Sequence, residues 1–434
     1  MTGAAMTGAA LTGAATTAAA VTPSTLLPLE RLREVLGVRI SAEQGEVVTA
    51  PLKAGVVVAG AGSGKTATMV ARVAWLVASG LVQPDQVLGL TFTSKAADEL
   101  AGRVRAALRT LRTAGLVAPD VAELEPVVST YHAYAGRLVR DHALRLGREP
   151  AARLVTPATS WQLAARAVST YDGPMDAVGW AESTVVQAVL QLAGDLAEHL
   201  VETDDVLALT GSLQALADAA SPLRADGRKV LACQATRAQL LPVVAQYAAA
   251  KRARDLLDFG DVVALAARLA RDCPEVREVE RAASRVVLLD EYQDTGAAQE
   301  VLLSALFGED HAVTAVGDPC QSIYGWRGAS AGTLRRFPAV FGARRTDPRT
   351  LRTTYRNGGR ILLLANAISA PLRTTGVPVP ELEPAPGADD DGVVRCALLP
   401  DVEAEAAWVA DGVVAAIRAL EDPVPGAPDW ARAA

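Results

Sequence analysis

An eight-residue run, AGAGSGKT at residues 59–66, constrains the fold of this chain more than any other stretch. The apolar run 55–58 precedes it, and an Ala-rich pattern of helical periodicity follows it. A strand that leads through a glycine-rich loop into a helix is the arrangement of a phosphate-binding loop. The alternative, a short Gly/Ser turn with a chance lysine, is disfavoured by that strand and that helix. The sequence therefore predicts a bound nucleoside triphosphate.

The residues of this loop have distinct expected roles. The glycines allow backbone conformations that point successive N–H groups at phosphate oxygens. Lys65 is expected to reach the β- and γ-phosphates, and the Thr66 hydroxyl is expected to ligate Mg²⁺. The common pattern G-x-x-x-x-G-K-[ST] begins with glycine, whereas this chain has Ala59 there. The predicted nucleotide-binding set is Ala59, Gly60, Ala61, Gly62, Ser63, Gly64, Lys65 and Thr66.

Composition limits the class of protein. A chain of 434 residues is expected to hold about two to four domains. Its net charge of −7 argues against a generally basic surface for nucleic acid, although a local basic groove is compatible with that charge. The cysteines are far apart and have no metal-ligand spacing, which favours a reduced, cytoplasmic protein; they are Cys233, Cys273, Cys320 and Cys396.

The N-terminal residues have low complexity. Residues 1–20 repeat a TGAA unit and lack the basic and continuous apolar regions of a signal peptide, so a disordered leader is predicted over residues 1–25. No stretch approaches the roughly 18 uninterrupted apolar residues of a membrane span, and no membrane partner is expected.

Strand and helix patterns alternate over two separated parts of the chain. Strands are predicted at 55–58, 89–93, 127–130, 285–289 and 311–316, which indicates a doubly wound parallel sheet in an α/β core formed by residues 26–140 and 251–348. Residues 141–250 are Ala/Leu-rich with helical periodicity and predict an inserted all-helical domain. Residues 349–434 predict an incomplete second unit, with a strand at 393–398 and a helix at 402–420.

Two carboxylates, Asp290 and Glu291, end the apolar run 285–289 in the manner of a Walker B site. Asp290 is expected to hold Mg²⁺ opposite Thr66, and Glu291 is expected to orient and deprotonate the attacking water. Gln321 follows the next strand, and neighbouring strands of a doubly wound sheet share one ligand crevice, so it could reach a γ-phosphate or that water. An acidic strand end and a polar turn are each common by chance. Their combination with the phosphate loop favours a catalytic site.

Aromatic residues form only 4% of the chain, so local groups of them stand out. Tyr324, Trp326 and Arg327 are a candidate stacking platform for unpaired bases, and packing in a core is the alternative. Further candidates for nucleic-acid or phosphate contacts have an ordinary structural role as their alternative; they are Phe92, Thr130, His132, Tyr355 and Arg356.

These motifs, in this order, resemble those of the UvrD/Rep/PcrA family of superfamily 1 DNA helicases, from about residue 40 to at least residue 366. The most specific matches are DEYQDT at 290–295 and VGDPCQSIYGWRGA at 316–329. Further matches lie at 41–44, 90–97, 129–132, 257–261 and 354–357. The family's phosphate loop also begins with a small residue, as Ala59 does here.

The resemblance implies a RecA-like P-loop NTPase core, with an inserted helical domain and part of a second RecA-like core. It implies ATP in the cleft between the cores and single-stranded DNA across both. Gln44 would contact adenine, Tyr355 would stack on it, and Arg356 would approach the γ-phosphate. The implied catalytic set is Lys65, Asp290, Glu291, Gln321 and Arg356, and the implied base contacts are Phe92, Tyr324 and Trp326.

The later motifs of the family are not visible in this sequence. The expected function is the N-terminal motor portion of an ATP-dependent 3′–5′ DNA helicase, in the cytoplasm with the nucleoid. Its partners would be single-stranded or partly duplex DNA and subunits of repair or recombination. The alternative is a truncated module that binds nucleotide and DNA without efficient turnover. A small-molecule kinase would leave the runs DEYQDT and GDPCQSIY unexplained.

Overall fold

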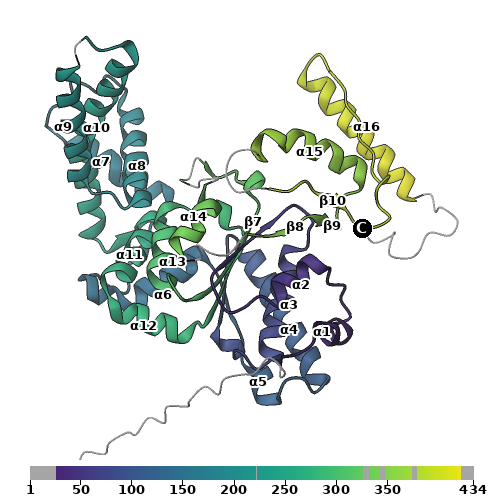
Figure 1. Ribbon diagram of the computed structural model, residues 1–434. Coiled ribbons are helices and arrows are strands. Elements are labelled where there is room, and N and C mark those ends of the chain that lie inside the picture. Colours follow the sequence, from purple (N-terminus) through teal and green to yellow (C-terminus); the bar gives the residue numbers. More distant parts are fainter. Residues whose placement is uncertain are drawn as a thin grey trace, which may run out of the picture.

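A computed structural model describes residues 26–220, 222–325, 328, 332–342, 348–373 and 379–421. The predicted leader over residues 1–25 lies outside the described residues, as do Trp326 and Arg327. Figure 1 shows a central sheet with helices on both sides, a helical projection at one end and two further helices, α15 and α16, toward the C-terminus.

Six parallel strands form the central sheet, in the order β3-β2-β6-β7-β1-β8. Their bounds are β1 Gly55–Ala59, β2 Val87–Thr91, β3 Val127–Thr130, β6 Val286–Leu289, β7 Ala312–Gly317 and β8 Arg349–Leu351. The predicted strand 89–93 thus lies two residues earlier, and Phe92 follows its end. A mixed α/β structure with a parallel sheet of six strands fits a RecA-like core.

Alternate residues of the strands face opposite layers of helices, as the two-residue period of a strand requires. In β1, Val56 and Val58 belong to one apolar cluster, whereas Val57 and Ala59 belong to another. Both faces are covered, which is why these strands are continuous apolar runs rather than alternating ones.

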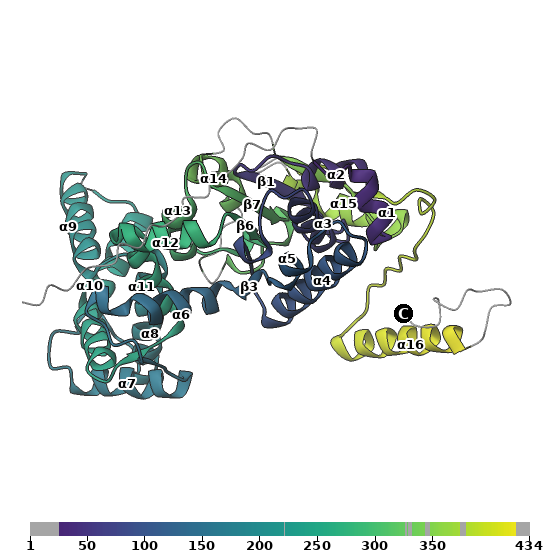
Figure 2. The ribbon, with the colours of Figure 1, turned by 90° about the horizontal axis from the view of Figure 1, so that it is seen from below.

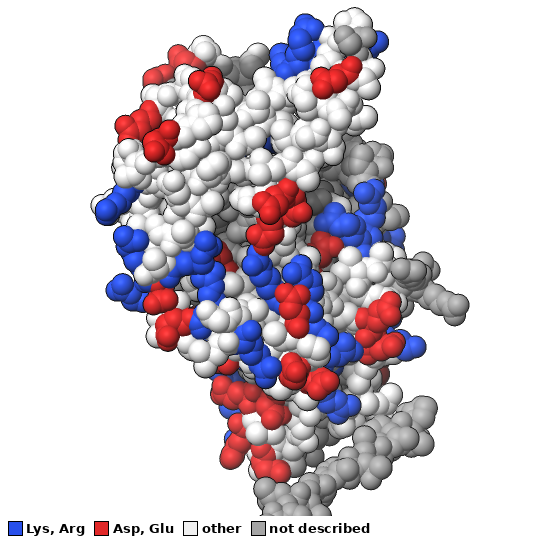
Figure 3. Space-filling model, turned by 90° about the vertical axis from the view of Figure 1, so that its left-hand side faces the viewer, with Lys and Arg blue, Asp and Glu red and all other residues white. Residues whose placement is uncertain are grey.

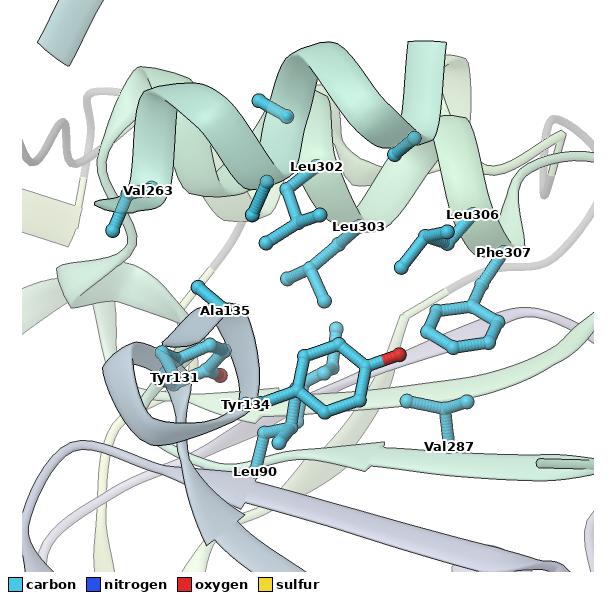
Figure 4. Packing of buried hydrophobic residues seen from close by; sticks show 14 of the residues in the cluster. Leu90, Tyr131, Tyr134, Ala135, Val263, Val287, Leu302, Leu303, Leu306 and Phe307 are labelled. Carbon is cyan, nitrogen blue, oxygen red and sulfur yellow. The ribbon is translucent and has the colours of Figure 1, made fainter. Parts of the chain in front are cut away.

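The first layer consists of α6 Tyr131–His142, α11 Phe259–Asp272, α12 Pro274–Ala283, α13 Ala297–Phe307 and α14 Thr333–Val340. Figure 4 shows Leu302 and Leu303 of α13 packed over Leu90 and Val287 of the sheet, with the rings of α6 beside them. The second layer consists of α1 Leu29–Leu36, α2 Ala42–Val48, α3 Lys65–Ala78 and α4 Ser94–Thr113, followed by the short α5 Pro119–Glu123. Residues 26–50 contain the helix pair α1 and α2.

Four helices form the projection: α7 Pro157–Thr170, α8 Glu182–His199, α9 Thr203–Ala219 and α10 Ala225–Arg252. They have an apolar cluster of their own, to which α7, α8 and α10 contribute. The short strands β4 Arg153–Leu154 and β5 Leu256–Leu257 pair where the chain enters and leaves this segment. We call residues 157–252 the helical segment; its interpretation as an inserted domain with bounds 141–250 stays a prediction.

The C-terminal residues begin inside the first sheet. β8 pairs with β1, so the sheet includes residues 349–351, which the sequence division assigned to the second unit. Beyond it, β9 Thr353–Thr354 pairs with β10 Glu383–Pro384, and α15 Gly359–Arg373 lies between them in sequence. Figure 2 shows α16 Val402–Glu421 set apart from the sheet and its helices, on the side opposite the helical segment.

The strand predicted at residues 393–398 is wrong, because these residues form no regular structure. A strand needs a hydrogen-bonded neighbour, and none of the described strands pairs with this stretch. Val393 is 73% exposed and the Leu398 side chain is fully exposed, so no packing compensates. The helix predicted over 402–420 is confirmed as α16. Within the described residues, no helix combines the length and apolar character that crossing a membrane requires.

Candidate nucleotide and nucleic-acid sites

Three polar segments meet at one edge of the sheet. The phosphate loop follows β1, the pair Asp290 and Glu291 follows β6, and Asp318 follows β7. Because β6, β7 and β1 are neighbours and parallel, their carboxyl ends lie together. This edge is the place where an α/β sheet of this kind binds ligands.

The phosphate loop has the backbone that its glycines were expected to permit. Gly62 and Gly64 have φ values of 78° and 82°, which side-chain-bearing residues rarely adopt. The Ser63 hydroxyl donates to the Gly60 carbonyl at 2.8 Å. α3 begins at Lys65, so the N-terminus of this helix faces the loop, as anion binding requires.

Lys65 and Glu291 link the phosphate loop to the segment after β6. Lys65 Nζ lies 2.9 Å from Glu291 Oε2, and the amide nitrogen of Gln293 donates to the same oxygen at 2.8 Å. Glu291 has a left-handed backbone, with φ 50° and ψ 40°. A non-glycine residue in this region carries strain, which is common at functional sites. The turn directs the Glu291 carboxylate from the end of β6 toward the loop.

Asp290 lies deeper, and its pKa is raised to about 6 by burial and by the charge of Glu291. The Tyr131 hydroxyl donates to the Asp290 carbonyl at 3.0 Å. No group of three or more His, Cys, Asp or Glu side chains in the described ranges is arranged to hold a metal by itself. The hydroxyl of Thr66 and the carboxylate of Asp290 are nevertheless oxygen donors of the kind that Mg²⁺ takes alongside phosphate oxygens.

Gln293 joins the segments after β6 and β7, and it was not among the predicted site residues. Its Oε1 accepts from the Asp318 backbone at 3.0 Å, while its nitrogen contacts Glu291. Gln321, the predicted catalytic glutamine, donates to Asp318 Oδ2 at 2.6 Å. A chain of hydrogen bonds through Asp318 and Gln293 therefore connects Gln321 with Glu291. Its position in the sequence, between the acidic residues 290–291 and 294, could have identified Gln293 as a site residue.

Gln44 supports the phosphate loop from α2. Its Oε1 accepts from the Ser41 backbone at 3.0 Å, and its Nε2 donates to the Ser63 carbonyl at 3.0 Å. Next to it lies a cavity of about 330 Å³ between α1, α3 and α4. The cavity is lined by Leu36, Val38, Ile40, Gln44, Ala67 and Ala71, among others.

Residues 354–356 contact the loop from the other side. The Thr354 hydroxyl donates to the Ala61 carbonyl at 2.9 Å, and the Tyr355 backbone donates to the Gly62 carbonyl at 2.9 Å. An added Cβ at Gly62 would overlap Thr354 Oγ1 and would lie 2.5 Å from Cβ of Arg356. The side chains of Tyr355 and Arg356 are exposed beside the loop.

Aromatic rings lie beside the same edge of the sheet. The Phe92 and Tyr324 rings are parallel within 3°, with centroids 6.3 Å apart. His132 and Phe259 meet edge to face at 5.7 Å, and Phe259 is 59% exposed. Phe259 lies within the family match at 257–261, for which the sequence predicted no role. The Thr130 hydroxyl accepts from the Ala133 backbone at 3.1 Å and so caps α6.

The charges on one side of the molecule are mixed. Figure 3 shows Lys and Arg interspersed with Asp and Glu on that face, without a continuous basic stripe. This distribution agrees with the net charge of −7 and does not by itself indicate a nucleic-acid surface on that side.

Comparisons with known proteins agree with this geometry. Residues 40–341 match the model of the UvrD/REP helicase N-terminal domain. ATP-dependent DNA helicase UvrD2 of Mycobacterium tuberculosis is 33% identical over 345 residues, which are 76% of this chain and 43% of that protein. ATP-dependent DNA helicase Rep of Salmonella typhimurium is 30% identical over 330 residues, 75% of this chain and 42% of that protein. UvrD1 of Mycobacterium tuberculosis is 30% identical over 323 residues, 72% of this chain and 37% of that helicase.

The chain thus spans less than half the length of these curated relatives. The family model covers well over half of the chain, and it includes the phosphate loop, the acidic pair and the segment from Asp318 to Tyr324. This chain belongs to the UvrD/Rep helicase family.

Proposed function

We propose that this chain is the N-terminal motor portion of an ATP-dependent DNA helicase that moves 3′ to 5′ on single-stranded DNA. The observation that carries the proposal is the meeting of Lys65, Glu291 and Gln293 at the carboxyl ends of adjacent parallel strands. The names of the relatives support the same class of activity.

The proposed ATP site follows from the loop and its neighbours. Backbone N–H groups of residues 60–66 and Lys65 would bind the phosphates, and Thr66 and Asp290 would hold Mg²⁺. The metal would neutralise charge on the phosphates. The apolar cavity beside Gln44 would take part of the base, and the exposed ring of Tyr355 would cover it.

Glu291 is the proposed base for water attack on the γ-phosphate. In this structure its carboxylate is bonded to Lys65 and Gln293. Phosphates compete with Glu291 for Lys65, so substrate binding would release the carboxylate toward water. Gln321 and Arg356 would then contact the γ-phosphate, Gln321 from the β7 edge and Arg356 from the segment after β9.

The proposed path for single-stranded DNA runs over the aromatic rings beside the sheet edge, of which Phe259 is exposed and Phe92, Tyr324 and His132 are half-buried. Phe92 and Tyr324 would stack on bases, and Phe259 with His132 would extend the row. Trp326 and Arg327 would join them, and Thr130 would contact phosphate. We further propose a cytoplasmic, nucleoid-associated protein that acts in repair or recombination with other subunits.

ATP hydrolysis with and without a single-stranded oligonucleotide tests the proposal. Wild-type protein is expected to hydrolyse ATP faster with DNA, and Lys65→Ala is expected to abolish that hydrolysis. Lys229→Ala on the exposed surface of α10 is the matched control and should behave as wild type. Stimulated turnover that survives Lys65→Ala would refute the assignment. Unwinding of duplexes with either a 3′ or a 5′ overhang then tests the direction.

A binding module without efficient turnover is the second candidate, and the C-terminal helices favour it. Leu363 and Ile368 of α15 are 76% and 69% exposed, and Val413 of α16 is 53% exposed. The described residues therefore supply little of a second wall to the cleft. Tight binding of a fluorescent ATP analogue without DNA-stimulated hydrolysis would select this candidate. Robust turnover would exclude it.

A further inference from the structure

The last turn of α8 brings a carboxylate from the helical segment to the sheet layer. Glu198 lies at the first two backbone N–H groups of α13, those of Ala297 and Ala298. Burial raises the pKa of Glu198, and the interactions with these N–H groups oppose that rise. Glu198 Oε1 is buried and makes no hydrogen bond to any described residue. Two residues later, Leu200 packs against the apolar cluster that contains α13. The end of α8 is thus fixed to the sheet layer by a polar and an apolar contact.

Two glycines form the slot that holds this carboxylate. An added Cβ at Gly296 would overlap Glu198 Oε1, and one at Gly328 would lie 2.7 Å from Glu198 Cγ. The glycines come from different segments: Gly296 follows the acidic residues 290–294, and Gly328 follows Tyr324. Glu198 therefore touches both chain segments that lead away from the site.

The Glu198 carboxylate lies where α13 lacks a side-chain acceptor, because the N-cap of this helix is a glycine. Gly296 has no side chain with which to bind the first N–H groups of the helix, and a helix start normally has such an acceptor. Gln299 accepts from the Gly296 backbone at 3.2 Å, which serves a different N–H group. A negative charge at this end also interacts favourably with the helix dipole.

We propose that Glu198 is a positioning residue that couples the helical segment to the segments after β6 and β7. By holding Gly296 and Gly328 against α8, it makes the site residues and the helical segment move together. The degree to which single-stranded DNA stimulates ATP hydrolysis depends on this contact, a statement that rests on the proposed function.

Two variants remove the contact in different ways. Glu198→Gln keeps the shape of the side chain and removes its charge. Gly296→Ala keeps Glu198 and fills the slot, and its backbone, with φ −83°, accepts alanine without strain. Asp195→Asn and Gly194→Ala are matched controls on α8, because Asp195 is exposed and an added Cβ at Gly194 meets nothing.

Both variants are expected to lower DNA-stimulated turnover about fivefold, the factor that corresponds to a helix cap of ordinary strength. Hydrolysis without DNA should stay within about twofold of wild type, since α13 remains packed by Leu302 and Leu303. Amide hydrogen exchange of residues 290–300 should accelerate in both variants and in neither control. Faster exchange with unchanged DNA stimulation would overturn the coupling, because Glu198 would then only cap a helix.

The two proposals fail in distinguishable ways. If wild-type hydrolysis does not respond to DNA, the proposed function fails, and hydrogen exchange alone then decides the role of Glu198. Equal exchange of residues 290–300 in wild type and Glu198→Gln would overturn the positioning role in either case.

Discussion

Replacing Arg72 with leucine is expected to destabilise the protein strongly, although Arg72 touches no predicted site residue. Its guanidinium, 1% exposed on α3, donates to four carbonyls at the end of α2. The distances are 2.9 Å to Val47, 3.2 Å to Val48, 2.9 Å to Ala50 and 3.3 Å to Pro51. The last carbonyls of a helix have no partner within the helix, so Arg72 supplies the donors that α2 lacks.

The expected loss of stability depends on which of the four carbonyls would stay buried without a donor after Arg72 is replaced. Val47 and Val48 are 2% and 0% exposed, but the Val47 carbonyl also accepts from the Ala50 backbone at 3.3 Å. One acceptor, the Val48 carbonyl, would therefore stay buried without a donor. Each buried, unsatisfied acceptor costs about 1–3 kcal/mol. We therefore expect Arg72→Leu to lose about 1–3 kcal/mol of stability.

Urea unfolding followed by far-ultraviolet circular dichroism measures this loss. Arg72→Lys should lie between wild type and Arg72→Leu, because one ammonium group cannot reach four carbonyls. Arg112→Leu, on the exposed surface of α4, is the control and should change the midpoint little. α2 also carries Gln44, so ATP affinity should fall with stability in Arg72→Leu. A loss below about 1 kcal/mol would refute the assignment of Arg72 as the cap of α2.

Three further changes test other parts of the structure. Glu291→Gln should lower ATP turnover about 100-fold or more, because the proposed base is lost, while ATP binding changes little because the shape of the side chain is kept. Single-turnover kinetics measure this loss. Near-normal turnover would exclude Glu291 as the base. The pKa of His311 is lowered by burial, and its Nε2 lies 2.6 Å from the Ser284 carbonyl. The unfolded state therefore takes up a proton first as pH falls, so stability should decline below about pH 6.5. His311→Gln should flatten that decline in thermal melts, and an unchanged pH profile would contradict the argument. Phe259→Ala should weaken binding of single-stranded DNA by about 1–3 kcal/mol, measured by fluorescence anisotropy, because a stacking ring is lost. Unchanged affinity would remove Phe259 from the proposed DNA path.

Short-range sequence patterns correctly predicted the helices and strands whose formation depends mainly on their own residues. The apolar run before the phosphate loop, the loop itself and α3 follow one another directly, so spacing alone identified them. The helix predicted at 402–420 is correct for the same reason, because helical periodicity is local. The strand order β3-β2-β6-β7-β1-β8 was not predicted, since it depends on pairing between distant residues.

The wrong and the missing predictions concern residues whose structure or role depends on contacts with a distant part of the chain. Residues 393–398 have the composition of a strand, but no described strand pairs with them. Gln293 joins the β6 edge to Asp318, and Phe259 meets His132, and both contacts are made with residues far away in sequence. Arg72 resembles any helical arginine until its four carbonyl partners are known. Glu198 was missed for the same reason, because its slot is made by glycines about 100 and 130 residues later.

The phosphate loop is held from three directions, and this explains how one ligand could affect the whole molecule. Gln44 bonds Ser63 from α2, Thr354 bonds Ala61 from the segment after β8, and Glu291 bonds Lys65 from β6. Under the proposed function, phosphates displace only the last of these contacts, because only Lys65 offers its side chain to them. The other two bonds involve loop carbonyls, which phosphates do not compete for. Nucleotide binding would therefore release Glu291 for catalysis while α2 and residues 353–356 stay attached to the loop and move with it.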